Sequence, residues 1–266
     1  MEKSPEKRGF VTAKRGKIVI EQDNASGGVT YWLARGPQSL ADRKGISQAA
    51  YIHALYGFLR QARPGTILLI GCGGGTLATM LARSRAGATM LARSRAGATM
   101  LAKGGAKITM LDVDPLSFDL ARRYFHLPKS IACHLADGAA FLRASPARYD
   151  AIVLDAYGDG GVPRHLLRGS FFGLVKSRLA RGGIFLINMI AADDDDKAPD
   201  RVGWRLKRAF PSVRICDAEG ELDRNVLLLG GHVRNLKRPR LLLRPARGSG
   251  ELAAELKRFD FRGLRV

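Results

Sequence analysis

The feature that most constrains this fold is an apolar segment, residues 66–70, that runs directly into a glycine-rich turn, residues 71–75. An apolar helical pattern starts at Thr76, so this stretch predicts a strand, a tight turn and a helix in succession. Glycine lets the backbone approach a ligand closely, and the first turn of a helix has N–H groups free to bind it. This arrangement is typical of nucleotide-type sites in doubly wound α/β folds.

Strand-like and helix-like segments alternate along the rest of the chain. Because the strands are continuously apolar, the pattern predicts a mostly parallel sheet that is covered on both faces. Two closely spaced strands predict a terminal antiparallel hairpin, so the expected fold is an α/β, class I methyltransferase-like (Rossmann-like) sheet. The predicted strands are 66–70, 107–111, 131–135, 149–154, 184–188, 213–216 and 225–229; the predicted helices start near 76 and span 115–125, 138–143, 163–179 and 200–210.

The chain divides into three predicted parts. Residues 1–45 form a small N-terminal β appendage, in which strands 17–21 and 29–33 flank a turn. Residues 46–235, which begin with a helix over 46–61, form the nucleoside-binding catalytic domain, and 236–266 form a basic C-terminal extension. No apolar run approaches the roughly 20 residues that a membrane span needs, and no secretory signal is apparent. We expect a soluble, cytoplasmic chain with no membrane partner, and a homodimer remains open.

A ten-residue phrase at 78–87 is repeated identically at 88–97, and a degenerate copy follows at 98–107. Each copy would displace the apolar stripe of a helix by roughly 80°. One helix over residues 76–102 would be about 40 Å long, whereas neighbouring strands reach only about 20 Å. We interpret residues 78–97 as a tandem-duplication insertion that has no function of its own.

The net charge is +20 and the isoelectric point is about 10.6. Such a charge permits a polyanionic partner such as nucleic acid, although no aromatic residues interleave the densest basic patch, residues 237–247. The three cysteines and five histidines show no metal-ligand spacing, so the sequence predicts no metal site.

Acidic residues follow successive predicted strands. Once the twenty inserted residues are removed, Asp112 stands at the usual βαβ distance from the glycine turn, where a carboxylate accepts ribose hydroxyls. Its alternative role is to complement a helix dipole. Asp114, just before Pro115, is expected to be an N-cap residue. Asp137 either accepts a purine amino group or caps the next helix.

The fourth strand ends at Asp155, and Tyr157 and Asp159 follow in a glycine-rich loop. Asp155 or Asp159 is expected to orient or deprotonate an amine acceptor, and Tyr157 to line the substrate. The alternative is a polar turn in which Asp155 is bonded to backbone. His165 is the one histidine singled out as a site residue. The acidic run 193–196 either overhangs the crevice or forms a solvated loop.

Together these motifs resemble the spermidine synthase family and its diverged relatives. The resemblance covers roughly residues 15–232 and is carried by segments 70–76, 111–115, 136–138, 154–157, 163–166 and 224–225. It implies a donor of the S-adenosylmethionine type, which is decarboxylated in true aminopropyltransferases. By matched position, Gln38 faces the donor, Asp112 holds the ribose, Asp137 holds the adenine amino group, and Asp155 lies beside the reacting centre. The turn glycines Gly71, Gly73 and Gly75 are expected to let the backbone approach the donor.

Two positions depart from the family pattern. Gly73 stands where the family carries an aspartate for the amine end of the donor, and Gly158 stands where it carries a second aspartate. Both changes weigh against a polycationic acceptor. The sequence predicts a transferase that moves an aminopropyl or related group to an amine acceptor. A methyltransferase that uses S-adenosylmethionine and a non-catalytic nucleoside- or nucleic-acid-binding protein are the alternatives.

Deletion of residues 78–97 tests whether the repeat is dispensable. The deletion joins Leu77 to Ala98 and keeps one copy of the phrase, so we expect the variant to fold and to keep its affinity for the donor. Thermal unfolding and donor titration check this. A variant that does not fold would show that the repeat is structural.

Overall fold

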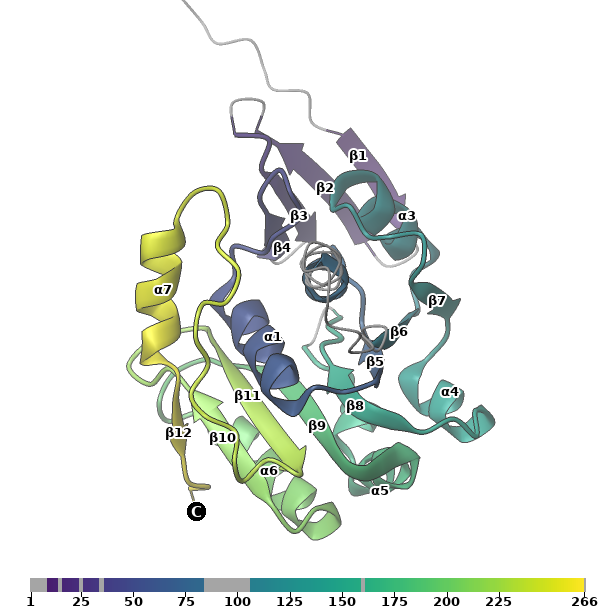
Figure 1. The fold of residues 1–266 in the computed structure, drawn as a ribbon, viewed down its shortest axis with the longest axis vertical. Coiled ribbons are helices and arrows are strands. Elements are labelled where there is room, and N and C mark those ends of the chain that lie inside the picture. Colours follow the sequence, from purple (N-terminus) through teal and green to yellow (C-terminus); the bar gives the residue numbers. More distant parts are fainter. Residues whose placement is uncertain are drawn as a thin grey trace, which may run out of the picture.

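The computed structural model describes residues 9–13, 16–23, 26–33, 36–83, 106–158 and 161–265, and they are arranged around one large sheet (Figure 1). Its order is β12-β10-β11-β9-β8-β5-β6-β7. Strands β5, β6, β7, β8 and β9 are parallel, whereas β10, β11 and β12 pair antiparallel, which confirms the predicted fold class. The strands are β5 (Thr66–Ile70), β6 (Lys107–Asp112), β7 (Ala132–Leu135), β8 (Tyr149–Leu154), β9 (Leu179–Ala191), β10 (Val213–Asp217), β11 (Arg224–Gly231) and β12 (Asp260–Arg262).

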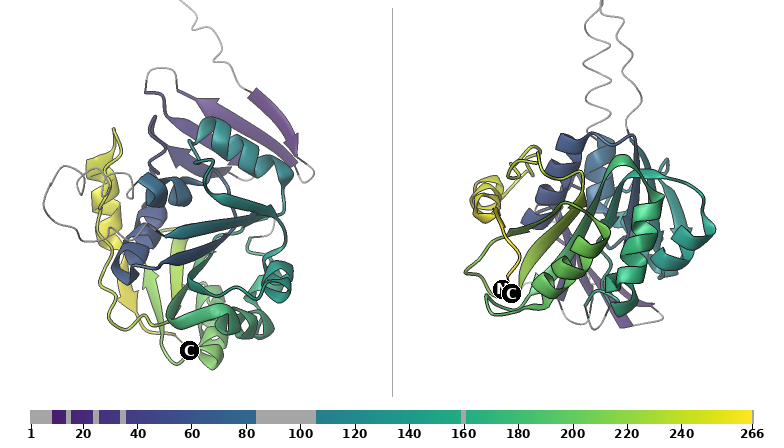
Figure 2. Two further views of the ribbon diagram at one scale, coloured as in Figure 1. Left: turned by 45° about the vertical axis from the view of Figure 1, so that its right-hand side comes forward. Right: turned by 90° about the horizontal axis from the view of Figure 1, so that it is seen from below.

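Helices cover both faces of this sheet, as its two-sided apolar strands require (Figure 2). Ile67 and Leu69 of β5 pack with α1 (Ala50–Ala62), α3 (Pro115–Tyr124), α7 (Ser249–Arg258) and the helix that begins at Thr76. Leu68 and Ile70 of the same strand pack on the other side, with α4 (Gly138–Ala144), α5 (Gly169–Arg178) and α6 (Ala198–Ala209). None of the helices in the described ranges has the length and apolar character needed to cross a bilayer.

A four-stranded antiparallel sheet precedes the large one and consists of β1 (Gly9–Ala13), β2 (Gly16–Gln22), β3 (Val29–Leu33) and β4 (Gly36–Ala41). The predicted hairpin over 17–33 is confirmed as β2 and β3. Ile18, Ile20 and Tyr31 of this sheet are buried against Phe125, just after α3. The packing holds the small sheet over the carboxyl ends of the parallel strands.

Two features differ from the sequence prediction. The predicted helix 163–179 is divided into a short 3-10 helix, η1 (Arg164–Leu167), and α5, because Arg168 is extended. Gly182 and Gly183 fall between the predicted helix and the predicted strand 184–188, and the structure places them inside β9. The register between β8 and β9 shifts there, because residues 180–183 lie between the partners of Tyr149 and Ala151, so this part of the longer strand is irregular.

Of the repeated phrase, the structure describes residues 78–83, which continue the helix from Thr76 and bury Ala78 and Met80 in the core. The rest of the predicted insertion lies outside the described residues. The proposed division at residues 45 and 235 remains a prediction.

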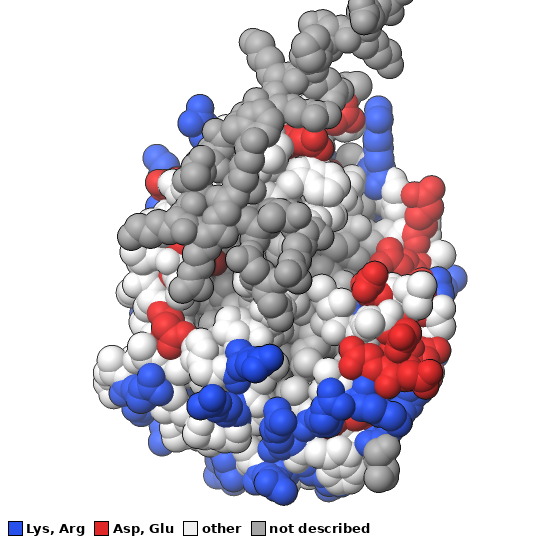
Figure 3. Space-filling view, turned by 180° about the vertical axis from the view of Figure 1, so that it is seen from behind, with Lys and Arg blue, Asp and Glu red and all other residues white. Residues whose placement is uncertain are grey.

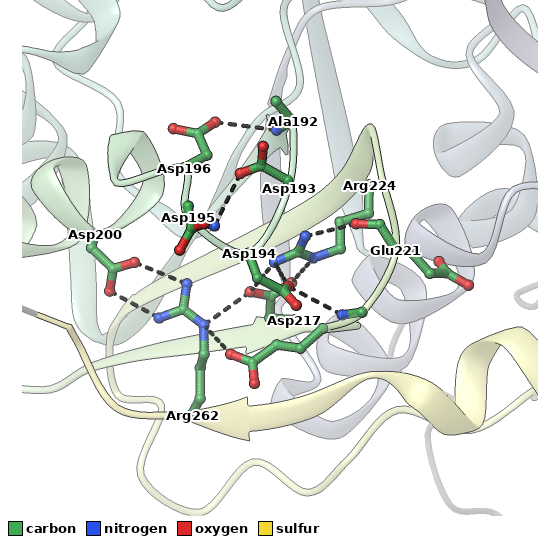
Figure 4. Close-up of polar contacts among 12 residues, drawn as sticks. Ala192, Asp193, Asp194, Asp195, Asp196, Asp200, Asp217, Glu221, Arg224 and Arg262 are labelled. Carbon is green, nitrogen blue, oxygen red and sulfur yellow. Dashed lines mark hydrogen bonds and ion pairs between the residues drawn. The ribbon is translucent and has the colours of Figure 1, made fainter.

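The C-terminal segment contributes to the large sheet through α7 and β12, which the sequence analysis did not predict. Arg262 of β12 binds Asp200 of α6 through two hydrogen bonds of 2.8 and 3.0 Å and donates to Asp217 at 2.9 Å (Figure 4). Arg224 binds the same Asp217 at 2.8 Å. Burial alone would raise the pKa of Asp200, but hydrogen bonds from Arg262 and the Arg265 N–H outweigh burial and lower the pKa.

Replacement of Arg262 tests this network. Arg262→Ala leaves the buried Asp200 without its two-point partner, so we expect a loss of about 3–5 kcal/mol in the free energy of unfolding, measured in urea. Because the pKa of Asp200 is lowered in the folded state, the difference from wild type should shrink as the pH falls below about 3.9.

Arg258→Ala is the matched control, because its pair with Glu221 lies half exposed and should contribute at most about 1 kcal/mol. Equal effects of the two variants would contradict this account of the network.

Candidate functional site

A cavity of about 370 Å³ opens at the carboxyl ends of β5, β6, β7 and β8, under the small sheet. The structure brings to this cavity all but one of the candidate site residues predicted from the sequence. Asp159, the exception, lies outside the described residues. The predicted residues that line the cavity are Gln38, Gly71, Gly73, Gly75, Asp112, Asp137, Asp155, Tyr157 and His165.

The glycine turn lies against the ends of both strands that flank β5. Gly71 has a φ of +102°, and a Cβ atom there would lie 2.2 Å from the carbonyl oxygen of Asp155. Its N–H donates to Leu111 at the end of β6 at 2.9 Å. Ser39 of β4 accepts a hydrogen bond from the Gly74 N–H at 2.8 Å, so the turn is also fixed to the small sheet. A side chain at position 71 would separate these strands.

Asp112 ends β6, and its carboxylate is bound to the glycine turn. One oxygen accepts from the Cys72 N–H at 2.8 Å, and the other accepts from the Asp114 N–H at 2.9 Å. Burial raises the pKa of Asp112, and these two hydrogen bonds oppose the rise. Asp114 is the N-cap of α3, as predicted, and accepts from the Leu116 N–H at 2.9 Å. Although the repeated phrase separates the glycine turn from Asp112 in the sequence, the two are therefore in direct contact.

Asp137 both lines the cavity and caps α4, so neither sequence interpretation excludes the other. Its Oδ1 accepts from the Ala140 N–H at 2.9 Å, and His165 of η1 lies with Nε2 2.6 Å from its Oδ2. Burial alone would raise the pKa of Asp137, but the hydrogen bonds from Ala140 and His165 outweigh burial and lower it.

Asp155 follows β8 directly, and within the described residues its carboxylate is hydrogen-bonded to a side chain and not to backbone. The Asn188 side chain of β9 donates to its Oδ1 at 2.8 Å, and the Asn225 side chain of β11 donates to Oδ1 of Asn188 at 3.0 Å. Burial raises the pKa of Asp155 to about 6, although the Asn188 hydrogen bond opposes this. The role of Asn188 was not predicted. Its one sign in the sequence is that it is a single polar residue within the apolar strand 184–190.

Two tyrosines lie beside Asp155. Tyr51 comes from α1, and Tyr157 comes from the segment after β8. Burial and the nearby Asp155 raise the pKa of both tyrosines, so both hydroxyls stay protonated. The Tyr157 hydroxyl is buried and has no hydrogen-bond partner among the described residues. Buried hydroxyls normally have a hydrogen-bond partner, so this hydroxyl is available to a group that enters the cavity.

Charge is strongly segregated between this cavity and the surface. Among the described residues that line the cavity, Asp112, Asp114, Asp137 and Asp155 are acidic and none is Lys or Arg. On the face shown in Figure 3, Lys and Arg gather where α5 and α6 lie. Exposed basic residues of these two helices are Lys176, Arg201, Arg205, Lys207 and Arg208. The chain as a whole is therefore basic, whereas its cavity is acidic.

The acidic run 193–196 does not line the cavity. Asp194 pairs with Arg224 at 2.9 Å, and Asp196 accepts from the Ala192 and Ala198 N–H groups (Figure 4). The run lies in an exposed loop on the surface side of the Arg224 and Arg262 network, so of the two alternatives the structure favours the solvated loop over the overhang of the crevice. No cluster of metal-ligating side chains occurs within the described ranges.

Comparison with known proteins identifies related chains. A family model described as "Spermine/spermidine synthase domain" matches residues 51–192. A probable polyamine aminopropyl transferase of Bifidobacterium longum is 37% identical over 84 residues, 32% of this chain and 19% of that protein. An eEF1A lysine and N-terminal methyltransferase of Mus musculus is 28% identical over 125 residues, 42% of this chain and 18% of that protein. The alignments thus span less than a fifth of either relative.

The fold has similar solved structures as well. The crystal structure of a probable spermidine synthase from Corynebacterium glutamicum matches with a TM-score of 0.70 at 16% identity, over 98% of this chain and 92% of that chain. At this identity the likeness establishes the fold, and activity has to be argued from the site.

Replacement of Asn188 tests the electrostatics of the cavity. Asn188→Ala removes the hydrogen bond that stabilises ionised Asp155, so the pKa of Asp155 should rise further above about 6. Carboxyl-carbon NMR titration measures the shift. Asn235→Ala, outside the cavity, is the control; an unchanged Asp155 pKa in Asn188→Ala would contradict the assignment.

Proposed function

Because the chain belongs to the spermine/spermidine synthase domain family, we propose that it binds a sulfonium donor of the S-adenosylmethionine type and transfers an aminopropyl or related group to an amine. The acidic cavity is the observation that carries this proposal. Sulfonium donors and protonated amines are cations, and the four aspartates attract both.

The same charge favours a decarboxylated donor. Intact S-adenosylmethionine has a carboxylate, which would enter a cavity that has four aspartates and no described Lys or Arg. The decarboxylated form keeps the sulfonium and ammonium charges and lacks that carboxylate. Gly73 removes one acidic side chain relative to the family pattern, but the remaining aspartates keep the cavity negative.

The donor's nucleoside is assigned to the glycine turn and the adjacent strand ends. Gly71, Gly73 and Gly75 let the backbone approach it, and Gln38 of β4 faces it. An ionised carboxylate has about four acceptor positions, and backbone N–H groups, chiefly those of Cys72 and Asp114, use part of this capacity at Asp112. The capacity that these bonds leave is assigned to the ribose hydroxyls. Asp137 is assigned the adenine amino group.

Transfer requires a neutral amine beside the donor carbon. The amine nitrogen attacks the carbon bonded to sulfur, and a nitrogen–carbon bond forms. The carbon–sulfur bond breaks, its electron pair stays on sulfur, and the donor leaves as a neutral thioether. The proton that the amine loses passes to Asp155, whose pKa of about 6 leaves it ionised and basic at neutral pH. The free Tyr157 hydroxyl is assigned to orient the acceptor. Asp159 remains an alternative base.

Methyl transfer is the second candidate, favoured by Gly73 and by the match to the eEF1A methyltransferase. The same fold and donor nucleoside serve both reactions. They differ in which carbon on sulfur is attacked, and therefore in whether the released thioether keeps its aminopropyl or its methyl group.

Calorimetric titration with decarboxylated and intact S-adenosylmethionine tests the proposal. We expect the decarboxylated form to bind at least about tenfold more tightly, because it avoids charge repulsion in the cavity. Asp112→Ala should weaken binding by about 2–4 kcal/mol, the scale of two hydrogen bonds to a charged acceptor, while Asp119→Ala on the exposed side of α3 should not. Preference for the intact donor would support methyl transfer, and no binding of either would reject the proposal.

A further inference from the structure

We infer that His165 is a positioning residue that holds Asp137 as an acceptor for the donor base, and so makes the cavity select 6-amino over 6-oxo purines. This inference rests on the proposed function, because it concerns the nucleoside half of the same donor site. Neither the comparisons nor the proposed chemistry gives this histidine a role.

The observation is a contact between two segments that are distant in sequence. Asp137 precedes α4, and His165 lies 28 residues later in η1, yet His165 Nε2 and Asp137 Oδ2 are 2.6 Å apart. Both residues line the cavity. His165 is half exposed and Asp137 about one-third exposed, so the pair lies at the mouth and not in the core. Leu166, the next residue, is buried and anchors η1 beside it.

The hydrogen-bond roles in this pair follow from the charge of Asp137. Its pKa is lowered, so the side chain is an ionised carboxylate that only accepts hydrogen bonds. His165 Nε2 must therefore be the protonated nitrogen that donates to Oδ2. The Ala140 N–H donates to Oδ1 at 2.9 Å. Two donors on different oxygens fix the plane of the carboxylate, and acceptor positions remain on both oxygens.

A fixed acceptor distinguishes purines by their group at position 6. An exocyclic amino group donates to the free lone pairs of Asp137, whereas a 6-oxo group would place its own lone pairs against a negative charge. A site that accepts a hydrogen bond from its ligand rejects analogues that lack the hydrogen-bond donor group, because the acceptor in the site is then left unpaired. Without His165, only backbone N–H groups of the first turn of α4 hold this partly exposed carboxylate, so its N-cap role persists while Oδ2 loses the side-chain donor that fixes its direction.

The test compares 5′-methylthioadenosine with its 6-oxo analogue, 5′-methylthioinosine, by calorimetry. The wild-type chain should bind the 6-amino nucleoside at least about tenfold more tightly. His165→Ala should reduce that ratio at least about fivefold, and His165→Gln, whose amide N–H can donate to Asp137, should restore most of it. Asp137→Asn, which adds a donor, should narrow or reverse the ratio.

His134→Ala is the matched control. His134 lies on β7 three residues before Asp137, is exposed and does not line the cavity, so its loss should leave the ratio unchanged. If His165→Ala keeps the wild-type ratio of affinities for the two nucleosides, the inference is wrong. It is also wrong if His165→Ala weakens the binding of both nucleosides equally and His165→Gln does not restore it. If the wild type binds neither nucleoside, the proposed function fails; if it binds both equally, the inference alone fails.

Discussion

The structure depends on the close approach at Gly71. Its backbone lies so near the Asp155 carbonyl that no side chain fits, and its N–H is bonded to the end of β6. This contact brings the ends of β5, β6 and β8 together, which places the Asp112 carboxylate on the turn and Asp155 beside it. The chemistry proposed here requires those two carboxylates to face one cavity, and a single glycine makes that geometry possible.

Segregation of charge explains how a chain with a net charge of +20 can serve cationic ligands. The described acidic residues of the cavity belong to strand ends that backbone geometry fixes, whereas many exposed lysines and arginines lie on covering helices such as α5 and α6. Counterions screen charges beyond about 10 Å in ordinary buffer, so the local carboxylates dominate what a ligand experiences in the cavity. Net charge, which permitted a polyanionic partner, was therefore a poor guide to the ligands that the cavity itself would attract.

Local patterns predicted much of the fold. Apolar strands, the glycine turn and the Asp114 cap are encoded over a few residues, and Asp112 could be placed once the repeat was removed. The pairings of Asp155 with Asn188, Asp137 with His165 and Arg262 with Asp200 join residues 33, 28 and 62 positions apart, and no local pattern encodes them. The same limit applies to β12, which is stabilised as an edge strand by its ion pairs, and to the register shift near Gly182.

If the acidic cavity directs aminopropyl transfer, the thioether released from the donor reveals which reaction takes place. The chain is incubated with a diamine and an equal mixture of decarboxylated and intact S-adenosylmethionine, and the nucleosides are resolved by mass spectrometry. We expect 5′-methylthioadenosine to form in equal amount with an aminopropylated amine, and Asp155→Asn to lose both products. Formation of S-adenosylhomocysteine in place of 5′-methylthioadenosine would rule out aminopropyl transfer.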